Sequence, residues 1–129
     1  MKRLGKELRG LSLYPYQDGG GCFVFSDTEN SRFAMIERLP PHRYIGSFRI
    51  ITGKYDRVTH SLDTALTPIS LGKKYPTGLF VCQDELNEDG ERQTYKLIHW
   101  DEIVHCFPDS LKIDLLVDPR KIGPHHKLP

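Results

Sequence analysis

The chain has few cysteines, no long hydrophobic run and no excess of charge of either sign. Its three cysteines, Cys22, Cys82 and Cys106, are odd in number and widely spaced, which fits neither a disulfide framework nor a C-x-x-C metal or redox motif. Lysine and arginine total 18 against 17 acidic residues, and no block of like charge occurs. No run approaches the roughly 20 apolar residues that span a bilayer, and the N-terminus leads into no hydrophobic signal region. We therefore expect no nucleic-acid partner and no membrane association.

The length of the chain favours a single domain. A protein of 129 residues is long enough to bury roughly 70% of its unfolded surface. We expect that domain over residues 1–120, followed by a loose Pro- and His-containing tail over 121–129. Cys22 in "GCFVF" and Cys82 in "LFVC" are interpreted as small buried hydrophobes. Nothing in these residues indicates a cellular location.

Short apolar and aromatic runs separated by turn residues predict an all-β fold. Four runs divided by Gly-, Asp- and Pro-containing turns predict an antiparallel four-stranded meander: "GLSLYPY", "GGGCFVFS", "SRFAMIER" and "HRYIGSFRII". Three further runs, "ALTPIS", "GLFVCQ" and "TYKLIHW", predict a second sheet, while "WDEIVHCF" predicts a short helix or turn. One more possible strand covers residues 111–117. Two successive sheets of about four short strands favour the blades of a β-propeller over a sandwich.

These segments together resemble the C-terminal part of the β-propeller phytases. The segment "RGLSLYPYQDGGGCFVFSDTENSRFAMIER" is similar to a family pattern with an E-G-L opening, then S-x-x-x-N-S, then an aromatic strand ending in E-R. "LGKKYPTGLFVCQDELN" is similar to L-G-x-x-Y-P-x-G-L-F-V-x-Q-D-G, and "YKLIHW" to the K-L-V-x-W segment that follows. "LKIDLLVDPR" is similar to the usual family ending, so we expect the C-terminus to be present. The resemblance covers nearly the whole chain and implies about two blades of a six-bladed propeller, the others lying upstream.

The resemblance also implies a reaction and a cofactor. Such phytases remove phosphate from phytate in a calcium-dependent reaction, in which carboxylates hold calcium ions at the channel mouth and a metal-activated water attacks phosphorus. The positions that match and carry a suitable oxygen are Asp84 and Asn87. A one-residue shift of the alignment adds Asp63. These three residues are the expected metal ligands.

Basic residues at matching positions are expected to contact the substrate, phytate or another phosphomonoester. Lys74 and Lys96 would meet a phosphate as point charges, and Arg9 would hold one through two parallel hydrogen bonds. Lys96 can equally be a solvated strand residue, and Asp84 with Asn87 can simply cap a turn. The residues alone leave these alternatives open.

Several positions of the phytase pattern carry different chemistry in this chain. The E-G-L glutamate is replaced by Arg9, which cannot ligate calcium, although Glu7 lies on the same face of an extended strand. An acidic T-D-G-I-D-like loop of the family falls on "HSLDTALTP", where its carboxylates become Leu62 and Ala65, and the asparagine before the last strand becomes Thr94. We therefore expect this chain by itself to be weak or inactive as an enzyme.

A second hypothesis is a non-catalytic β module. Two blades without the rest of a propeller would leave sheet edges and apolar faces uncovered. Such an edge can pair with another chain by strand addition. The partner could be a separately encoded chain that carries the missing N-terminal blades.

Overall fold

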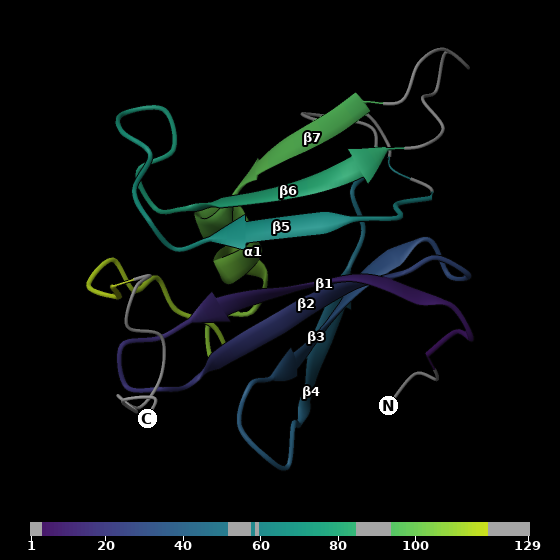
Figure 1. The fold of residues 1–129 in the computed structure, drawn as a ribbon, viewed down its shortest axis with the longest axis horizontal. Helices are drawn as coiled ribbons and strands as arrows, with labels where there is room; N and C mark the ends of the chain where they lie inside the picture. The colour runs from purple at the N-terminus through teal and green to yellow at the C-terminus, as the bar shows by residue number, and fades with distance from the viewer. Residues whose placement is uncertain (1–3, 52–57, 59, 85–93, 119–129) are drawn as a thin grey trace, which may run out of the picture.

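The computed structural model describes residues 4–51, 58, 60–84 and 94–118. Asn87 and the expected tail over 121–129 lie outside the described residues, and so does the domain boundary expected at residue 120. The described chain forms two antiparallel sheets and one short helix (Figure 1). The prediction of an all-β fold is confirmed.

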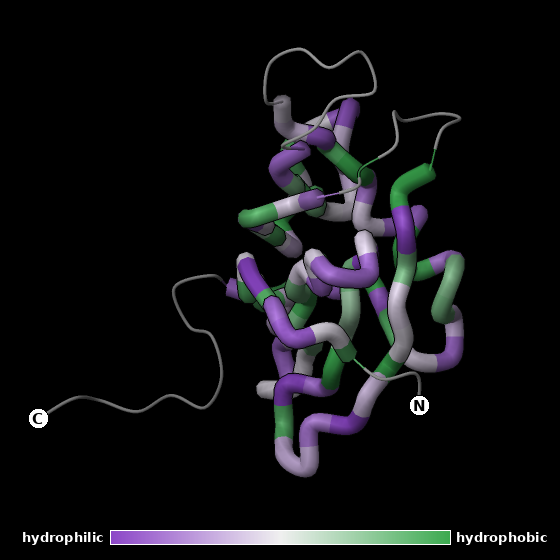
Figure 2. The backbone as a smooth tube through the Cα atoms, turned by 90° about the vertical axis from the view of Figure 1, so that its right-hand side faces the viewer, coloured by the Kyte–Doolittle hydropathy of each residue, from purple (hydrophilic) through white to green (hydrophobic). Residues whose placement is uncertain are grey.

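The first sheet is the four-stranded meander that the sequence predicts. Its strands are β1 (Leu8–Pro15), β2 (Gly21–Asp27), β3 (Arg32–Glu37) and β4 (Tyr44–Phe48), in the order β1-β2-β3-β4. Every neighbouring pair is antiparallel. The two central strands β2 and β3 are apolar and buried along most of their length, as expected of strands covered on both faces. Figure 2 shows apolar and polar stretches interspersed along the described chain.

The second sheet has three strands in the order β5-β6-β7, followed by the helix. The strands are β5 (Thr64–Thr67), β6 (Leu79–Asp84) and β7 (Thr94–His99), and α1 (Trp100–Cys106) follows β7 directly. The acidic residues Asp101 and Glu102 lie in the first turn of α1, where the helix dipole favours negative charge. In the described part of the chain, no helix is long and apolar enough to cross a membrane.

The strand predicted over residues 111–117 is wrong. Three of its backbone groups bond to aromatic side chains instead of a neighbouring strand. The amides of Lys112 and Asp114 donate to the hydroxyls of Tyr16 and Tyr14 at 3.3 and 3.0 Å, and the Lys112 carbonyl accepts a bond from Trp100 Nε1 at 3.1 Å. Because these groups are already satisfied, the segment has no need of a sheet ladder.

One hydrophobic core joins the two sheets and the helix. Trp100 is fully buried, and its ring stacks on Tyr14 with centroids 4.3 Å apart. The interpretation of two cysteines as buried hydrophobes is confirmed. The core contains side chains of the first sheet, the second sheet and α1, including Tyr14, Cys22, Val24, Phe33, Met35, Phe80, Cys82, Ile98, Trp100 and Ile103.

The innermost strands β1 and β5 meet at Gly10. The pairing of β1 with β2 shifts register between Arg9 and Ser12, and Gly10 has φ +64°. A Cβ on Gly10 would lie 2.7 Å from the Thr64 amide nitrogen, so only glycine fits this contact. The Thr64 hydroxyl donates to the Gly10 carbonyl and lies 3.0 Å from the Ser12 hydroxyl. This contact fixes the start of β1 against the start of β5.

Candidate functional site at the shared end of the two sheets

Four of the six predicted site residues lie at one end of the molecule. β1 and β5 both begin there, because Gly10 packs against Asp63 and Thr64. β6 ends beside the start of β5, since the Gln83 amide donates to the Asp63 carbonyl at 3.0 Å, and β7 begins opposite the end of β6. We call this region the shared end. The predicted residues at the shared end are Arg9, Asp63, Asp84 and Lys96.

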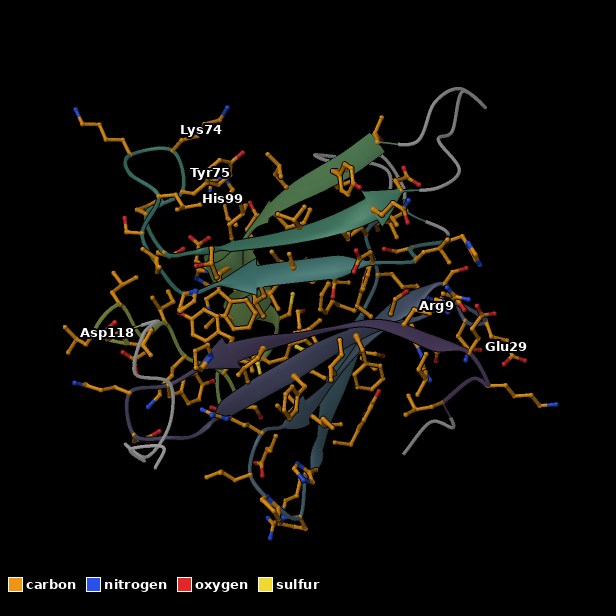
Figure 3. All side chains as sticks on the ribbon, in the orientation of Figure 1. Arg9, Glu29, Lys74, Tyr75, His99 and Asp118 are labelled. Atoms are coloured by element: carbon orange, nitrogen blue, oxygen red, sulfur yellow. The ribbon has the colours of Figure 1, made fainter. Side chains whose placement is uncertain are left out.

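Lys74 is the predicted residue that the structure separates from these four. It lies in the connection from β5 to β6, at the opposite end of the second sheet (Figure 3). Its ammonium nitrogen is 5.8 Å from the centre of the Tyr75 ring, and that ring lies 4.8 Å from the His99 ring. Lys74 therefore cannot contact the same phosphate as a residue of the shared end.

Asp84 and Lys96 form an ion pair in the interior of the second sheet. Asp84 is fully buried, Lys96 is 14% exposed, and Lys96 Nζ lies 3.6 Å from Asp84 Oδ2. Lys96 Nζ also donates to Thr94 Oγ1 at 3.1 Å. The carboxylate expected to bind a metal and the lysine expected to bind phosphate therefore lie in contact with each other.

The other two predicted residues of the shared end are exposed. Asp63 accepts a hydrogen bond from the adjacent Thr64 amide at 2.9 Å through Oδ1. Arg9 Nε lies 2.7 Å from Glu7 Oε1, and the two side chains are 51% and 52% exposed. Glu7, which the sequence offered as a partial substitute for the family's glutamate, is thus paired with the arginine that replaces it.

A buried ion pair that sequence reasoning missed lies in the first sheet at the same end. Asp27 ends β2, Arg32 begins β3, and the two side chains are 0% and 3% exposed with Arg32 Nε 3.0 Å from Asp27 Oδ2. The same oxygen accepts bonds from Asn30 Nδ2 at 2.9 Å and from the Gly5 amide at 3.2 Å. The sequence signal for this pair was an Asp and an Arg on either side of a short hairpin turn. Antiparallel pairing places two such residues opposite each other, as it does Asp27 and Arg32.

Asp27 makes the stability of the protein sensitive to acid. Burial alone would raise the pKa of Asp27, but hydrogen bonds from Asn30, Gly5 and Arg32, with the charge of Arg32, outweigh burial and lower that pKa. Because the folded pKa lies below the unfolded value of about 3.9, ionised Asp27 stabilises the fold above that pH. This contribution is lost as the pH falls toward the folded pKa.

We expect Asp27→Asn to flatten the dependence of unfolding free energy on pH below about pH 4. Urea unfolding at a series of acidic pH values measures the slope for both proteins. Asp109→Asn, at an exposed aspartate beyond α1, is the matched control and should keep the wild-type slope. Equal slopes for wild type and Asp27→Asn would contradict the assignment.

The two buried thiols do not provide a nucleophile. Burial raises the pKa of both Cys22 and Cys82 to about 12, so each thiol stays protonated at neutral pH, and the thiolate is the reactive form. Cys106 is exposed on α1, and its sulfur lies 3.5 Å from the Glu102 carbonyl oxygen. Cys82 pairs with Thr64 and Lys96 at the shared end, but as a buried protonated thiol it supplies no nucleophile there.

The donors described at the shared end do not make a calcium site by themselves. Calcium takes six to eight oxygen ligands, and the described residues contain no group of three or more His, Cys, Asp or Glu side chains placed to hold a metal. Asp84 contacts the Lys96 ammonium, and one Asp63 oxygen caps the adjacent amide. The metal-ligand role of Asp63, Asp84 and Asn87 stays a prediction.

The arrangement of the strands and the sequence comparisons agree on a class. Two successive antiparallel sheets, sharing a core and meeting at their innermost strands, are consistent with partial blades of a β-propeller. The family model for phytases matches residues 1–125. The 3-phytase of Bacillus subtilis (strain 168) is 32% identical over 123 residues, which cover 92% of this chain and 32% of that protein.

The chain therefore belongs to the phytase family. It spans about a third of the length of the curated relative it matches. The resemblance drawn from the sequence is confirmed.

Proposed function

We propose that this chain forms C-terminal blades of a phytase-type phosphomonoester hydrolase, and that by itself it releases little or no phosphate from phytate. The observation that carries the proposal is the family match over residues 1–125 together with the charge pairing at the shared end. A phosphohydrolase needs cationic groups that neutralise the phosphate and an activated water. The two lysines and the arginine expected to bind phosphate do not converge on one point.

Two features support low activity. The sheets supply about two blades, whereas the family resemblance implies six around one channel, and the matched relative is about three times as long. The position of the family's glutamate carries Arg9, and the family's acidic loop falls on Leu62 and Ala65, the latter exposed in β5. Calcium, when bound in such an enzyme, would activate the attacking water, but its ligands here would have to include oxygens beyond those described.

The test is phosphate release from phytate by the purified chain, with added calcium, without it, and with a chelator. We expect no release above the no-enzyme control in all three conditions. Calcium-dependent release would show that this chain builds a working site and would overturn the claim of inactivity. Bacillus subtilis 3-phytase, assayed in parallel, verifies that the assay detects phosphate release from phytate.

The second candidate function is a β module that pairs with another chain. The outer edge of β7 favours it, because no strand among the described residues pairs with that edge, and β7 carries Tyr95 and Leu97 exposed at 65% and 41%. Neither a proline nor a bulge interrupts this strand, so a partner strand can add along it. An inactive chain that binds a chain carrying the remaining blades would support this function.

A further inference from the structure

We propose that Arg9 forms a phosphate-binding site that works without a divalent metal ion, with Glu7 as its positioning residue. The proposal deepens the proposed function, on which the choice of phosphate as ligand rests. At the shared end, Arg9 would hold the phosphate and Glu7 would orient the Arg9 side chain. Three features of the structure carry it: the donors that Arg9 leaves available, the rigid backbone beneath it, and the pairing of the nearby carboxylates.

The ion pair with Glu7 leaves one side of the Arg9 guanidinium for a ligand. Glu7 Oε1 accepts from Arg9 Nε at 2.7 Å, which occupies the donor nearest the side-chain stem. In the described part of the structure, no other hydrogen bond or ion pair involves the Arg9 side chain, which is 51% exposed. Its two terminal amino groups therefore remain for an anion, and their planar spacing matches two oxygens of a phosphate.

Two other basic groups described at the shared end, Lys96 and Arg32, have their donors committed to the protein. Lys96 contacts Asp84 and Thr94, and Arg32 is 3% exposed against Asp27. Both side chains therefore neutralise buried acids of their own sheets. Among Arg9, Arg32 and Lys96, only Arg9 is exposed to solvent, at 51%.

The backbone that carries Arg9 is held on both sides. The register of β1 shifts immediately after Arg9, and Gly10 adopts φ +64°, which is the geometry of a β-bulge. Bulges re-aim the neighbouring side chain and occur beside active sites. Gly10 also contacts Asp63 and Thr64, and its carbonyl accepts from the Thr64 hydroxyl. Arg9 therefore projects from a fixed point at the junction of the sheets.

The contacts of the nearby acids favour a site that works without a metal ion. Glu7 contacts Arg9, Asp84 contacts Lys96, and Asp63 caps the Thr64 amide. Glu7 and Asp84 thus have basic partners supplied by the protein, whereas Asp63 bonds only a neutral amide. A phosphate at this end would meet the positive charge of Arg9. The guanidinium would neutralise charge on two phosphate oxygens, as a bound cation does in a metal site.

Titration of the full chain with inorganic phosphate in the presence of a chelator tests the site. We expect the backbone amide signals of residues 8–11 to shift in nuclear magnetic resonance spectra and to give a dissociation constant. Arg9→Gln should weaken binding about tenfold, and Arg9→Lys should weaken it less because it keeps the charge and loses the fork. Arg43→Gln is the matched control, since Arg43 is an exposed arginine in the connection from β3 to β4.

Glu7→Gln separates positioning from simple charge. The amide oxygen still accepts from Arg9 Nε while one negative charge is removed, so phosphate should bind more tightly, by a few-fold. Glu7→Ala removes the acceptor as well as the charge, and its gain should be smaller than that of Glu7→Gln because Arg9 is no longer oriented. Equal affinities for the two variants would overturn the positioning role.

Three results would overturn the site itself: unchanged binding in Arg9→Gln, an equal loss in Arg43→Gln, or binding that appears only with calcium. The titration measures no turnover, so its result is distinct from that of the hydrolysis assay. An inactive chain that binds phosphate through Arg9 retains the site. If the wild-type chain hydrolyses phytate and Arg9→Gln binds phosphate as tightly as the wild type, the Arg9 site is wrong although the chain is an active phytase.

Discussion

Replacing Lys96 with methionine is expected to lower the free energy of unfolding by about 3 to 5 kcal/mol. The substitution leaves Asp84, which is fully buried, without the ammonium that lies 3.6 Å from its Oδ2. An uncompensated carboxylate in the protein interior is far more costly than the pair is stabilising. Urea unfolding followed by the fluorescence of Trp100, the one tryptophan of the chain, measures the change.

The double variant Asp84→Asn with Lys96→Met is expected to recover most of that loss, because neither charge then remains buried. Lys112→Met is the matched control. Its partner Asp18 lies 3.7 Å away, and both side chains are more than half exposed, so the loss should stay within about 1 kcal/mol. A similar loss in both lysine variants would contradict the buried-pair interpretation.

Calcium provides a further arm of the same experiment. If Asp84 is a calcium ligand, added calcium should restore the stability of Lys96→Met, since a bound ion would replace the missing ammonium. If Asp84 serves only as the partner of Lys96, calcium should change the unfolding free energy of Lys96→Met no more than that of the wild type. Preferential stabilisation of the variant would support the metal-ligand role expected from the sequence.

Replacing Gly10 with alanine is expected to destabilise the protein by about 3 kcal/mol or more. The new Cβ would lie 2.7 Å from the Thr64 amide nitrogen and 2.8 Å from Asp63 Cα. These are backbone atoms, so the clash can be removed only if the two sheets move apart. The positive φ of +64° adds a further penalty for any L side chain.

Gly72→Ala separates the two causes. Gly72 also has a positive φ, of +87°, but its Cβ would meet nothing within 4 Å. The loss there should be about 1 kcal/mol, the cost of the backbone conformation alone. Equal losses at both glycines, measured by urea unfolding, would show that the contact between β1 and β5 contributes nothing beyond φ.

The strands of both sheets were predictable because short apolar runs and turn residues are local signals. The β1–β2 turn at Gly19 and the three strands between residues 64 and 99 follow directly from them. Residues 111–117 have the same apolar composition, yet their backbone bonds to the hydroxyls of Tyr14 and Tyr16. These partners lie about 100 residues away in sequence, and no local pattern reports them.

The sequence proposed site residues, and only the structure shows which of them lie at the same end. Aligning the chain with the family identified Arg9, Asp63, Asp84 and Lys96, and the structure places all four at the shared end. The same alignment grouped Lys74 with them, although strand direction places it at the opposite end of the second sheet. It also left out the pair of Asp27 with Arg32.

The sequence by itself determined the two sheets, the buried thiols and the family, because these depend on residue type and on spacing along the chain. The tertiary structure decided which charges meet. Lys96 neutralises Asp84 because β6 and β7 pair in a register that places both side chains on the inner face. Glu7 and Arg9 lie at the junction of the sheets because Gly10, which has no side chain, lets β5 pack closely against β1. Contacts of this kind depend on register and on the crossing of strands, which no single stretch of sequence contains.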